Sequence, residues 1–285
     1  MGNVVGEGPA WHPEQQVLYW IDIRAQQLLR LDPATDALTR WDLPEVVGAM
    51  ALGAGNQIYL ALKHRVVSMD LSSGVLTDIA HVELDRPTNR LNDGKTSPSG
   101  KWFLFGSMDD RVNKESTGAL YCLSTKGDVV RLYDGLVVCN GIAWSADGAT
   151  LYFSDSFHGV LMRADWSEEK GSMGEPKLHA VLDDANGRPD GGNVDVDGNY
   201  WSAGVSAGCI NVLSPDGKVI DKVPLPSRAP TMATFGGGDL KTLYITSLVR
   251  PQWTEIGPCD GSLLEIHTNT TGRANALFSC AGGLG

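Results

Sequence analysis

Short apolar runs recur along the whole chain, and most of them follow a turn that contains glycine or aspartate. Aromatic and β-branched residues dominate these runs, which is typical of β-strands. The runs are VLYWIDI, QIYLAL, WFLFGS, TLYFSDS, NYWSAG and TLYITS. Amphipathic windows long enough for a stable helix are hard to find. The pattern therefore predicts an all-β protein.

The strand runs repeat with a regular period. Stepping back eleven residues from the second strand of each suspected unit gives one equivalent anchor per unit: Glu7, Val47, Asn92, Asn140, Asp190 and Met232. Neighbouring anchors are 40 to 50 residues apart, which is the length of a β-propeller blade. We expect one domain over 1–285, a six-bladed β-propeller with four strands in each blade. The expected blades are 6–46, 47–88, 89–138, 139–185, 186–228 and 229–285.

Aromatic residues at the strand centres are expected to fill the contacts between blades. A single four-stranded blade cannot cover its own two faces, whereas radial stacking buries both of them and ring closure protects the edges. The aromatic positions are Trp20, Tyr59, Trp102, Trp144, Tyr152, Trp201 and Tyr244.

The chain is acidic, with 23 basic and 34 acidic residues and a formal net charge of −11. This balance argues against a nucleic-acid partner and against an anionic membrane surface. No apolar run approaches the roughly 18 residues of a membrane span, and the N-terminus lacks the pattern of a secretory signal. Five scattered cysteines indicate reduced thiols rather than a disulfide framework. We expect a cytoplasmic protein.

The six anchors are expected to converge on one mouth of the central channel, where the innermost strands begin. Four of them carry side-chain oxygens: Glu7, Asn92, Asn140 and Asp190. Buried carboxylates are costly unless a cation neutralises them, and such oxygens suit hard divalent ions. The alternative is that the Asn-Gly and Asp-Gly pairs are ordinary turns. Glu7 favours the metal, because glutamate is not a turn former.

Several motifs, in order and at matching spacing, resemble the regucalcin and gluconolactonase family. They are GEGPAW at 6–11, NRLNDGK at 89–95, GALY at 118–121, NGIAWS at 140–145, RPDG at 188–191 and FGG at 235–237. The resemblance implies a six-bladed propeller that hydrolyses sugar lactones with one divalent cation on its axis.

The resemblance also assigns roles to individual residues. It implies Glu7, Asn140 and Asp190 as metal ligands, and Arg90 and Asn92 as substrate contacts. An acidic substrate contact of the family corresponds to Asp110, or to its neighbour Asp109.

The chain departs from the family at its N-terminus. Family members usually carry an extra strand before the Gly-Glu motif, which pairs with the C-terminus and closes the ring. Only five residues precede Gly6 here, so we expect the last blade to close differently or to have an open outer edge.

The expected function is hydrolysis of an aldonolactone to the sugar acid, assisted by Ca, Mn, Mg or Zn. The cation would polarise the carbonyl and activate water, while Asp190 acts as general base or only as a ligand. Arg90 would donate to the sugar, or form a salt bridge between blades. An anionic substituent on the sugar would meet Arg111, Lys114 and Arg188, unless these are solvated loop charges.

Two alternatives stay open. The same scaffold could carry a metal-dependent phosphotriesterase or aryl esterase, favoured by apolar residues such as Met50 and Met108. It could also be a non-catalytic calcium-binding propeller, because a fold does not determine a function.

Overall fold

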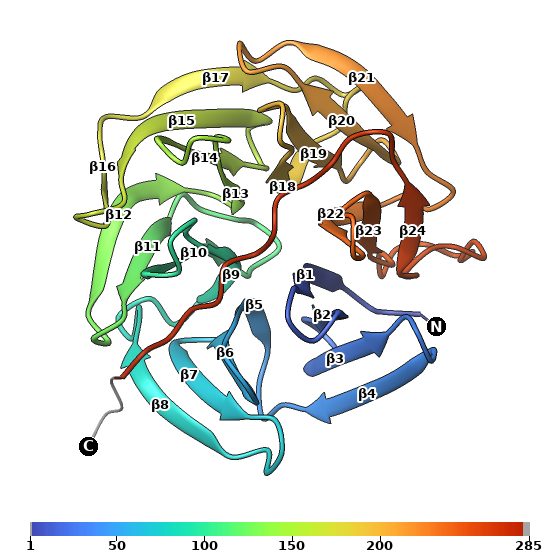
Figure 1. The fold of residues 1–285 in the computed structure, drawn as a ribbon. Helices are drawn as coiled ribbons and strands as arrows, with labels where there is room; N and C mark the ends of the chain where they lie inside the picture. Colours follow the sequence, from blue (N-terminus) through green and yellow to red (C-terminus); the bar gives the residue numbers. More distant parts are fainter. Residues whose placement is uncertain (1, 282–285) are drawn as a thin grey trace.

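The computed structural model describes residues 2–281. Twenty-four strands form six antiparallel sheets that radiate from a central channel, and no helix occurs in the described residues (Figure 1). The predicted all-β class and six-bladed propeller are confirmed. Accordingly, residues 2–281 contain no helix that is long and apolar enough to span a membrane.

The strands of each sheet follow one another in the chain. Blade 1 comprises β1 (Gly6–His12), β2 (Val17–Asp22), β3 (Gln27–Asp32) and β4 (Ala37–Asp42). Blade 2 comprises β5 (Val47–Leu52), β6 (Gln57–Leu62), β7 (Arg65–Asp70) and β8 (Leu76–His81). Blade 3 comprises β9 (Asn89–Thr96), β10 (Trp102–Asp109), β11 (Gly118–Ser124) and β12 (Val129–Leu136).

The second half of the ring is less regular. Blade 4 comprises β13 (Cys139–Trp144), β14 (Thr150–Asp155), β15 (Val160–Ser167), β16 (Ser172–Met173) and β17 (Lys177–Val181). Blade 5 comprises β18 (Pro189–Val194), β19 (Tyr200–Gly204), β20 (Cys209–Leu213) and β21 (Val219–Pro224). Blade 6 comprises β22 (Pro230–Gly236), β23 (Thr242–Ser247) and β24 (Leu264–His267). The prediction of four strands per blade is therefore wrong for blade 4, where β15 pairs with both β16 and β17, and for blade 6.

Burial falls from the axis outward. Every residue of the innermost strands β5, β13 and β22 is buried, whereas the outer strand β21 is almost entirely exposed. Innermost strands are covered on both faces, so they contain apolar and small residues without the polar alternation of a half-exposed strand.

Six hydrophobic clusters form the core, one between each pair of neighbouring blades. All seven aromatic residues predicted for these contacts belong to them. Trp11 of blade 1 stacks on Tyr244 of blade 6, with ring centroids 5.7 Å apart and planes 8° from parallel. Apolar packing therefore closes the ring between the first and last blades.

The N-terminus pairs with blade 6 without forming a named strand. Val5 bridges Leu248, the N–H of Val249 donates to the carbonyl of Val4 at 3.0 Å, and the N–H of Asn3 donates to the carbonyl of Gly261 at 2.7 Å. Blade 6 has three strands in the described chain, and the segment before Gly6 pairs beside its second strand.

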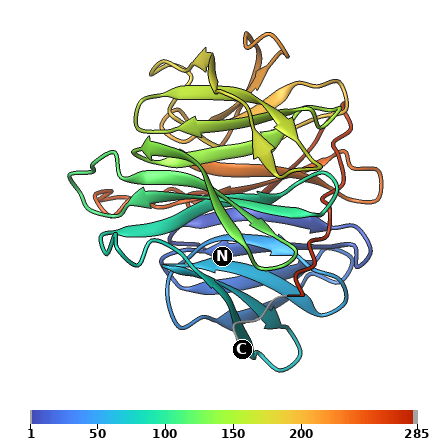
Figure 2. The ribbon, with the colours of Figure 1, turned by 90° about the vertical axis from the view of Figure 1, so that its left-hand side faces the viewer.

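Residues 268–281, which we call the C-terminal strap, leave blade 6 and cross one face of the ring (Figures 1 and 2). The Phe278 ring is fully buried between Tyr59 and Phe103, with centroids 4.9 and 6.1 Å away. The N–H of Phe278 also donates to the carbonyl of Leu52 at 2.7 Å. The strap therefore joins blade 6 to blades 2 and 3 on the far side of the ring.

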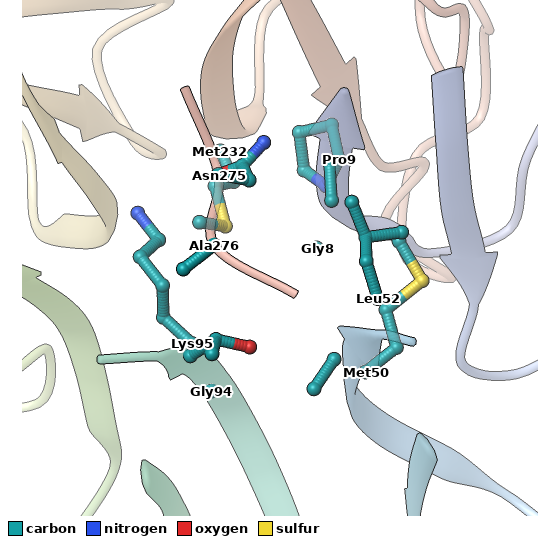
Figure 3. Close-up of a pocket in the computed structure, with 12 residues that line it drawn as sticks. Gly8, Pro9, Met50, Leu52, Gly94, Lys95, Met232, Asn275 and Ala276 are labelled. Atoms are coloured by element: carbon teal, nitrogen blue, oxygen red, sulfur yellow. The ribbon is translucent and has the colours of Figure 1, made fainter. Parts of the chain in front are cut away.

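The strap covers the end of the channel where the innermost strands finish. Asn275 and Ala276 face Lys95 of β9 and Leu52 of β5 across a small cavity (Figure 3). This end therefore lies opposite the mouth where the strands begin.

Candidate functional site

All six innermost strands carry a β-bulge at the predicted anchor. Pairing with the second strand shifts register within Glu7–Ala10, Val47–Ala49, Asn92–Gly94, Asn140–Ala143, Pro189–Gly192 and Pro230–Met232. A bulge kinks the strand and redirects its side chains. The Asn-Gly and Asp-Gly pairs therefore belong to bulges within strands, and the interpretation of these pairs as ordinary turns is wrong.

In blades 3, 4 and 5 the residue after the anchor helps to explain why the bulge can form. Gly141 adopts φ +67°, which disfavours residues with a Cβ atom. Gly191 allows close packing, since a Cβ atom there would lie 2.3 Å from the Met232 side chain. In β9 the equivalent position is Asp93, with φ +29°, and its carboxylate accepts hydrogen bonds from the N–H groups of Gly94 and Ile142.

A cavity of about 250 Å³ occupies the channel mouth at the start of the innermost strands. Five of the six predicted site residues line it, and these are Glu7, Arg90, Asn92, Asn140 and Asp190. Asp110 is not in the lining. The two apolar anchors are also elsewhere: Met232 lines the cavity under the strap, and Val47 is fully buried in the core.

The two carboxylates of the site are buried and poorly neutralised. Glu7 is 8% exposed and Asp190 is 7% exposed. Burial raises the pKa of Glu7 well above its ordinary value, and the nearby charges of Asp190 and Asp93 raise it further. Burial and Asp93 also raise the pKa of Asp190, against the opposing effect of Arg250.

Few hydrogen-bond donors reach these carboxylates. Glu7 accepts one hydrogen bond, at 3.1 Å from the N–H of Gly8. The Asp190 carboxylate accepts no hydrogen bond from residues 2–281. Buried carboxylates in native proteins are normally paired or bound to a metal, so this pair is a candidate for binding a cation.

A chain of hydrogen bonds links blades 3, 4 and 5 along one side of the cavity. Arg90 Nη1 donates to Asn92 Oδ1 at 2.7 Å, and Asn92 Nδ2 donates to Asn140 Oδ1 at 2.6 Å. Asn140 Nδ2 then donates to Ser156 Oγ at 2.7 Å, and this hydroxyl donates to the carbonyl of Pro189 at 2.5 Å. The chain fixes both amides and ends at the residue before Asp190.

Asp110 positions Arg90 instead of lining the cavity. Arg90 is 6% exposed and its Nε donates to Asp110 Oδ1 at 3.0 Å. Arg24 donates to the same carboxylate at 2.6 Å. Neighbouring Asp109 binds Arg111, whose Nη2 lies 2.8 Å away, so Arg111 belongs to a loop ion pair.

The donor set fits a hard divalent cation. Two buried carboxylates and an amide oxygen from separate blades face one cavity, and carboxylate and amide oxygens are ligands for calcium, magnesium and manganese. Residues 2–281 contain no group of three or more His, Cys, Asp or Glu side chains arranged for a metal. The candidate set is thus mixed, and Glu7, Asn140 and Asp190 would hold the ion.

Three residues at the site were not predicted. Asp93 is buried and its charge acts on both Glu7 and Asp190, Ser156 anchors Asn140, and Arg250 lines the cavity. The Asn-Asp-Gly run was a signal for Asp93, since a charged residue stands where glycine follows the anchor in blades 1, 2, 4 and 5. Ser156 and Arg250 lie after strand ends, where no repeat register places them.

Several known proteins are similar to this chain in sequence and in fold. Residues 5–249 match the family described as SMP-30/Gluconolactonase/LRE-like region. A 6-deoxy-6-sulfogluconolactonase of Pseudomonas putida is 34% identical, over 97% of this chain and 96% of the relative. An L-arabinolactonase of Azospirillum brasilense is 32% identical, over 97% of this chain and 93% of the relative.

Solved structures agree with the sequence comparisons. The crystal structure of a calcium-binding protein, regucalcin, from Agrobacterium tumefaciens superposes with a TM-score of 0.92. The match has 28% identity and covers 98% of this chain and 95% of that protein. The family match spans most of the chain and agrees with the six-bladed ring. The chain therefore belongs to the SMP-30/gluconolactonase family.

Proposed function

We propose that this protein hydrolyses a sugar lactone to the sugar acid, with a divalent cation held by Glu7, Asn140 and Asp190. The observation that carries the proposal is a pair of buried carboxylates, Glu7 and Asp190, that line one cavity and form no salt bridge within residues 2–281. Similarity to the lactonases of Pseudomonas and Azospirillum supports a lactone as the substrate.

A lactone is a cyclic ester, so its opening needs an attacking water and stabilisation of the developing oxyanion. A divalent cation supplies polarisation of the carbonyl and a lowered pKa for nearby water. The Asp190 carboxylate accepts no hydrogen bond from residues 2–281, so one of its oxygens is available to accept a proton from the attacking water. The water oxygen bonds to the carbonyl carbon, the ring C–O bond breaks, and the leaving oxygen takes up the proton that Asp190 accepted from the water.

Arg90 and Asn92 orient the sugar. Arg90 is buried and fixed at Nε by Asp110, and Nη1 is fixed by Asn92. These contacts hold the planar guanidinium in one orientation. Its Nη2 group therefore points in a fixed direction, which suits recognition of sugar hydroxyls or the ring oxygen. Such orientation lowers the entropic part of the barrier.

Calcium binding without turnover is the second candidate. It is favoured by the similarity to the structure described as a calcium-binding regucalcin. A cation that only binds needs no open mouth, whereas this cavity contains an arginine and an amide beyond the candidate ligands. The mouth favours an enzyme over a binding module.

The experiment follows proton release from a panel of aldonolactones and one phosphotriester, with and without a chelator. We expect hydrolysis of lactones that stops on chelation and returns with added Ca²⁺ or Mn²⁺. Asp190→Ala should abolish it. Full activity of Asp190→Ala would contradict the role of Asp190, and preference for the phosphotriester would favour an esterase.

A further inference from the structure

Two arginines stand between the site cavity and a neighbouring groove. Arg188 precedes β18 and Arg250 follows β23, so they come from blades 5 and 6. Both line the site cavity, and both also line an open groove of about 880 Å³. Val205 is the only other residue common to the two linings.

Neither arginine forms an ion pair with a carboxylate of residues 2–281. The Arg188 guanidinium lies over the Phe157 ring, 5.6 Å from its centroid. Arg250 Nη2 is 3.4 Å from the carbonyl oxygen of Val205, a long contact. Most of their side-chain N–H groups therefore donate to no acceptor within residues 2–281.

The other arginines around the mouth are neutralised. Arg24 and Arg90 share Asp110, and Arg111 is bound by Asp109 and Glu115. Arg188 and Arg250 therefore differ from these three arginines, because neither forms a salt bridge within residues 2–281.

The cavity lining contains positive charge that no carboxylate pairs with. Its cationic side chains are Arg90, Lys114, Arg188 and Arg250. Arg90 is paired with Asp110, whereas Arg188 and Arg250 form no salt bridge within residues 2–281. A bound divalent cation would add to the positive charge. An uncharged sugar would leave that charge unmatched, whereas an anionic sugar would balance it.

We infer that Arg188 and Arg250 form an anion subsite for a sulfonate or phosphate group at the end of the sugar remote from the lactone carbonyl. The inference rests on the proposed function, because it places the lactone ring over Asp190. Guanidinium groups suit this chemistry, since their paired N–H donors match two oxygens of such a group. Aromatic contact of Arg188 with Phe157 leaves the edge of its guanidinium to donate.

The similarity to a protein described as a 6-deoxy-6-sulfogluconolactonase is consistent with a sulfonate. A sulfonate and a phosphate monoester share a tetrahedral group with three outer oxygens. The two arginines would bind either group, and the substrates compared below distinguish a sulfonate from a phosphate.

The test compares kcat/KM for gluconolactone, its 6-phosphate and 6-deoxy-6-sulfogluconolactone. We expect at least one anionic lactone to exceed the neutral one by about tenfold or more, which corresponds to about 1.4 kcal/mol. In the double variant R188Q/R250Q this ratio should fall about tenfold or more. Arg250→Lys should keep part of the ratio, because it retains the charge without the fork.

Arg111→Gln is the matched control, because it removes an arginine near the same mouth that the structure pairs with carboxylates. Its ratio should match that of the unmodified protein. Equal hydrolysis of neutral and anionic lactones would overturn the inference. An unchanged ratio in R188Q/R250Q, or an equal fall in Arg111→Gln, would overturn it as well.

A binding measurement separates this inference from the proposed function. Calorimetry with 6-deoxy-6-sulfogluconate should show weaker binding in R188Q/R250Q than in the unmodified protein, whether or not any lactone is hydrolysed. Binding that depends on the arginines without turnover of any lactone would retain the subsite and reject the lactonase. Turnover of lactones with no dependence of binding on the arginines would retain the lactonase and reject the subsite.

Discussion

The Asn92 side chain donates to the amide oxygen of Asn140 at 2.6 Å, and so joins blade 3 to blade 4 beside the candidate metal site. Neither amide can rotate freely, because Arg90 holds Asn92 and Ser156 holds Asn140. The amide oxygen of Asn140, a residue that lines the cavity, is therefore positioned before any ligand binds. Preorganisation of this kind reduces the cost of reaching a productive geometry.

Ser156 should be needed for tight metal binding. Ser156→Ala leaves the Asn140 Nδ2 without its acceptor, and loss of such a supporting contact typically lowers metal affinity by about tenfold or more. Calorimetric titration with Mn²⁺ measures the change. Ser154→Ala is the matched control, since its buried hydroxyl has no hydrogen-bond partner and it lies on β14 of the same blade. Equal losses of affinity in both variants would contradict the role of Ser156.

Metal binding should raise thermal stability through Glu7. A ligand at about one hundred times its Kd stabilises the folded state by about 2.7 kcal/mol, so excess Ca²⁺ or Mn²⁺ should raise the Tm of chelated protein. Glu7→Gln should lose most of this rise. Glu265→Gln, which removes an exposed carboxylate of β24, should retain it. The idea fails if both variants respond equally to the metal.

Phe278 should fix the C-terminal strap to the ring. The ring is fully buried against Tyr59 and Phe103, and Phe→Ala at such positions costs about 3–5 kcal/mol. Chemical denaturation should show this loss for Phe278→Ala. The neighbouring exposed Ser279 provides the control, since Ser279→Ala should change stability by less than about 0.5 kcal/mol. A Phe278→Ala protein as stable as the control would show that the strap contributes nothing to ring stability.

Asp260 should make stability depend on acid pH. Hydrogen bonds from Arg228 lower the pKa of Asp260 to about 2, below the value near 3.9 of an unfolded chain. The folded state therefore binds fewer protons, and the stabilisation is present above about pH 4 and is lost as pH falls from about 4 to 2. Unfolding free energies at pH 7 and pH 3 measure this effect.

The comparison with Asp260→Asn isolates that carboxylate. The variant should be less stable at pH 7 by about 2 kcal/mol, because a buried charge-assisted contact is lost, and its stability should vary less between pH 7 and pH 3. Parallel pH curves for the two proteins would assign the acid sensitivity to other groups.

The sequence was most informative where structure repeats. Glu7, Asn140 and Asp190 occupy the same place in their blades, so one register predicts that they meet at the channel mouth. Their burial and shared cavity follow from the bulge that each innermost strand carries. The metal itself and the residue roles stay predictions, because no repeat pattern specifies a bound ion.

Residues outside the repeat could not be placed in advance. Arg250 lies in the long connection between β23 and β24, and Ser156 lies just after β14. The role of Asp110 was also hidden, because sequence proximity to Asp109 does not reveal that one aspartate holds Arg90 and the other holds Arg111. Loop conformation depends on contacts between distant segments, and local propensity does not encode these.

Anomalous scattering from a crystal grown with Mn²⁺ tests the central claim most directly. We predict one manganese peak in the site cavity, coordinated by oxygens of Glu7, Asn140 and Asp190. No peak in that cavity, or a metal bound there without these three side chains, would contradict it.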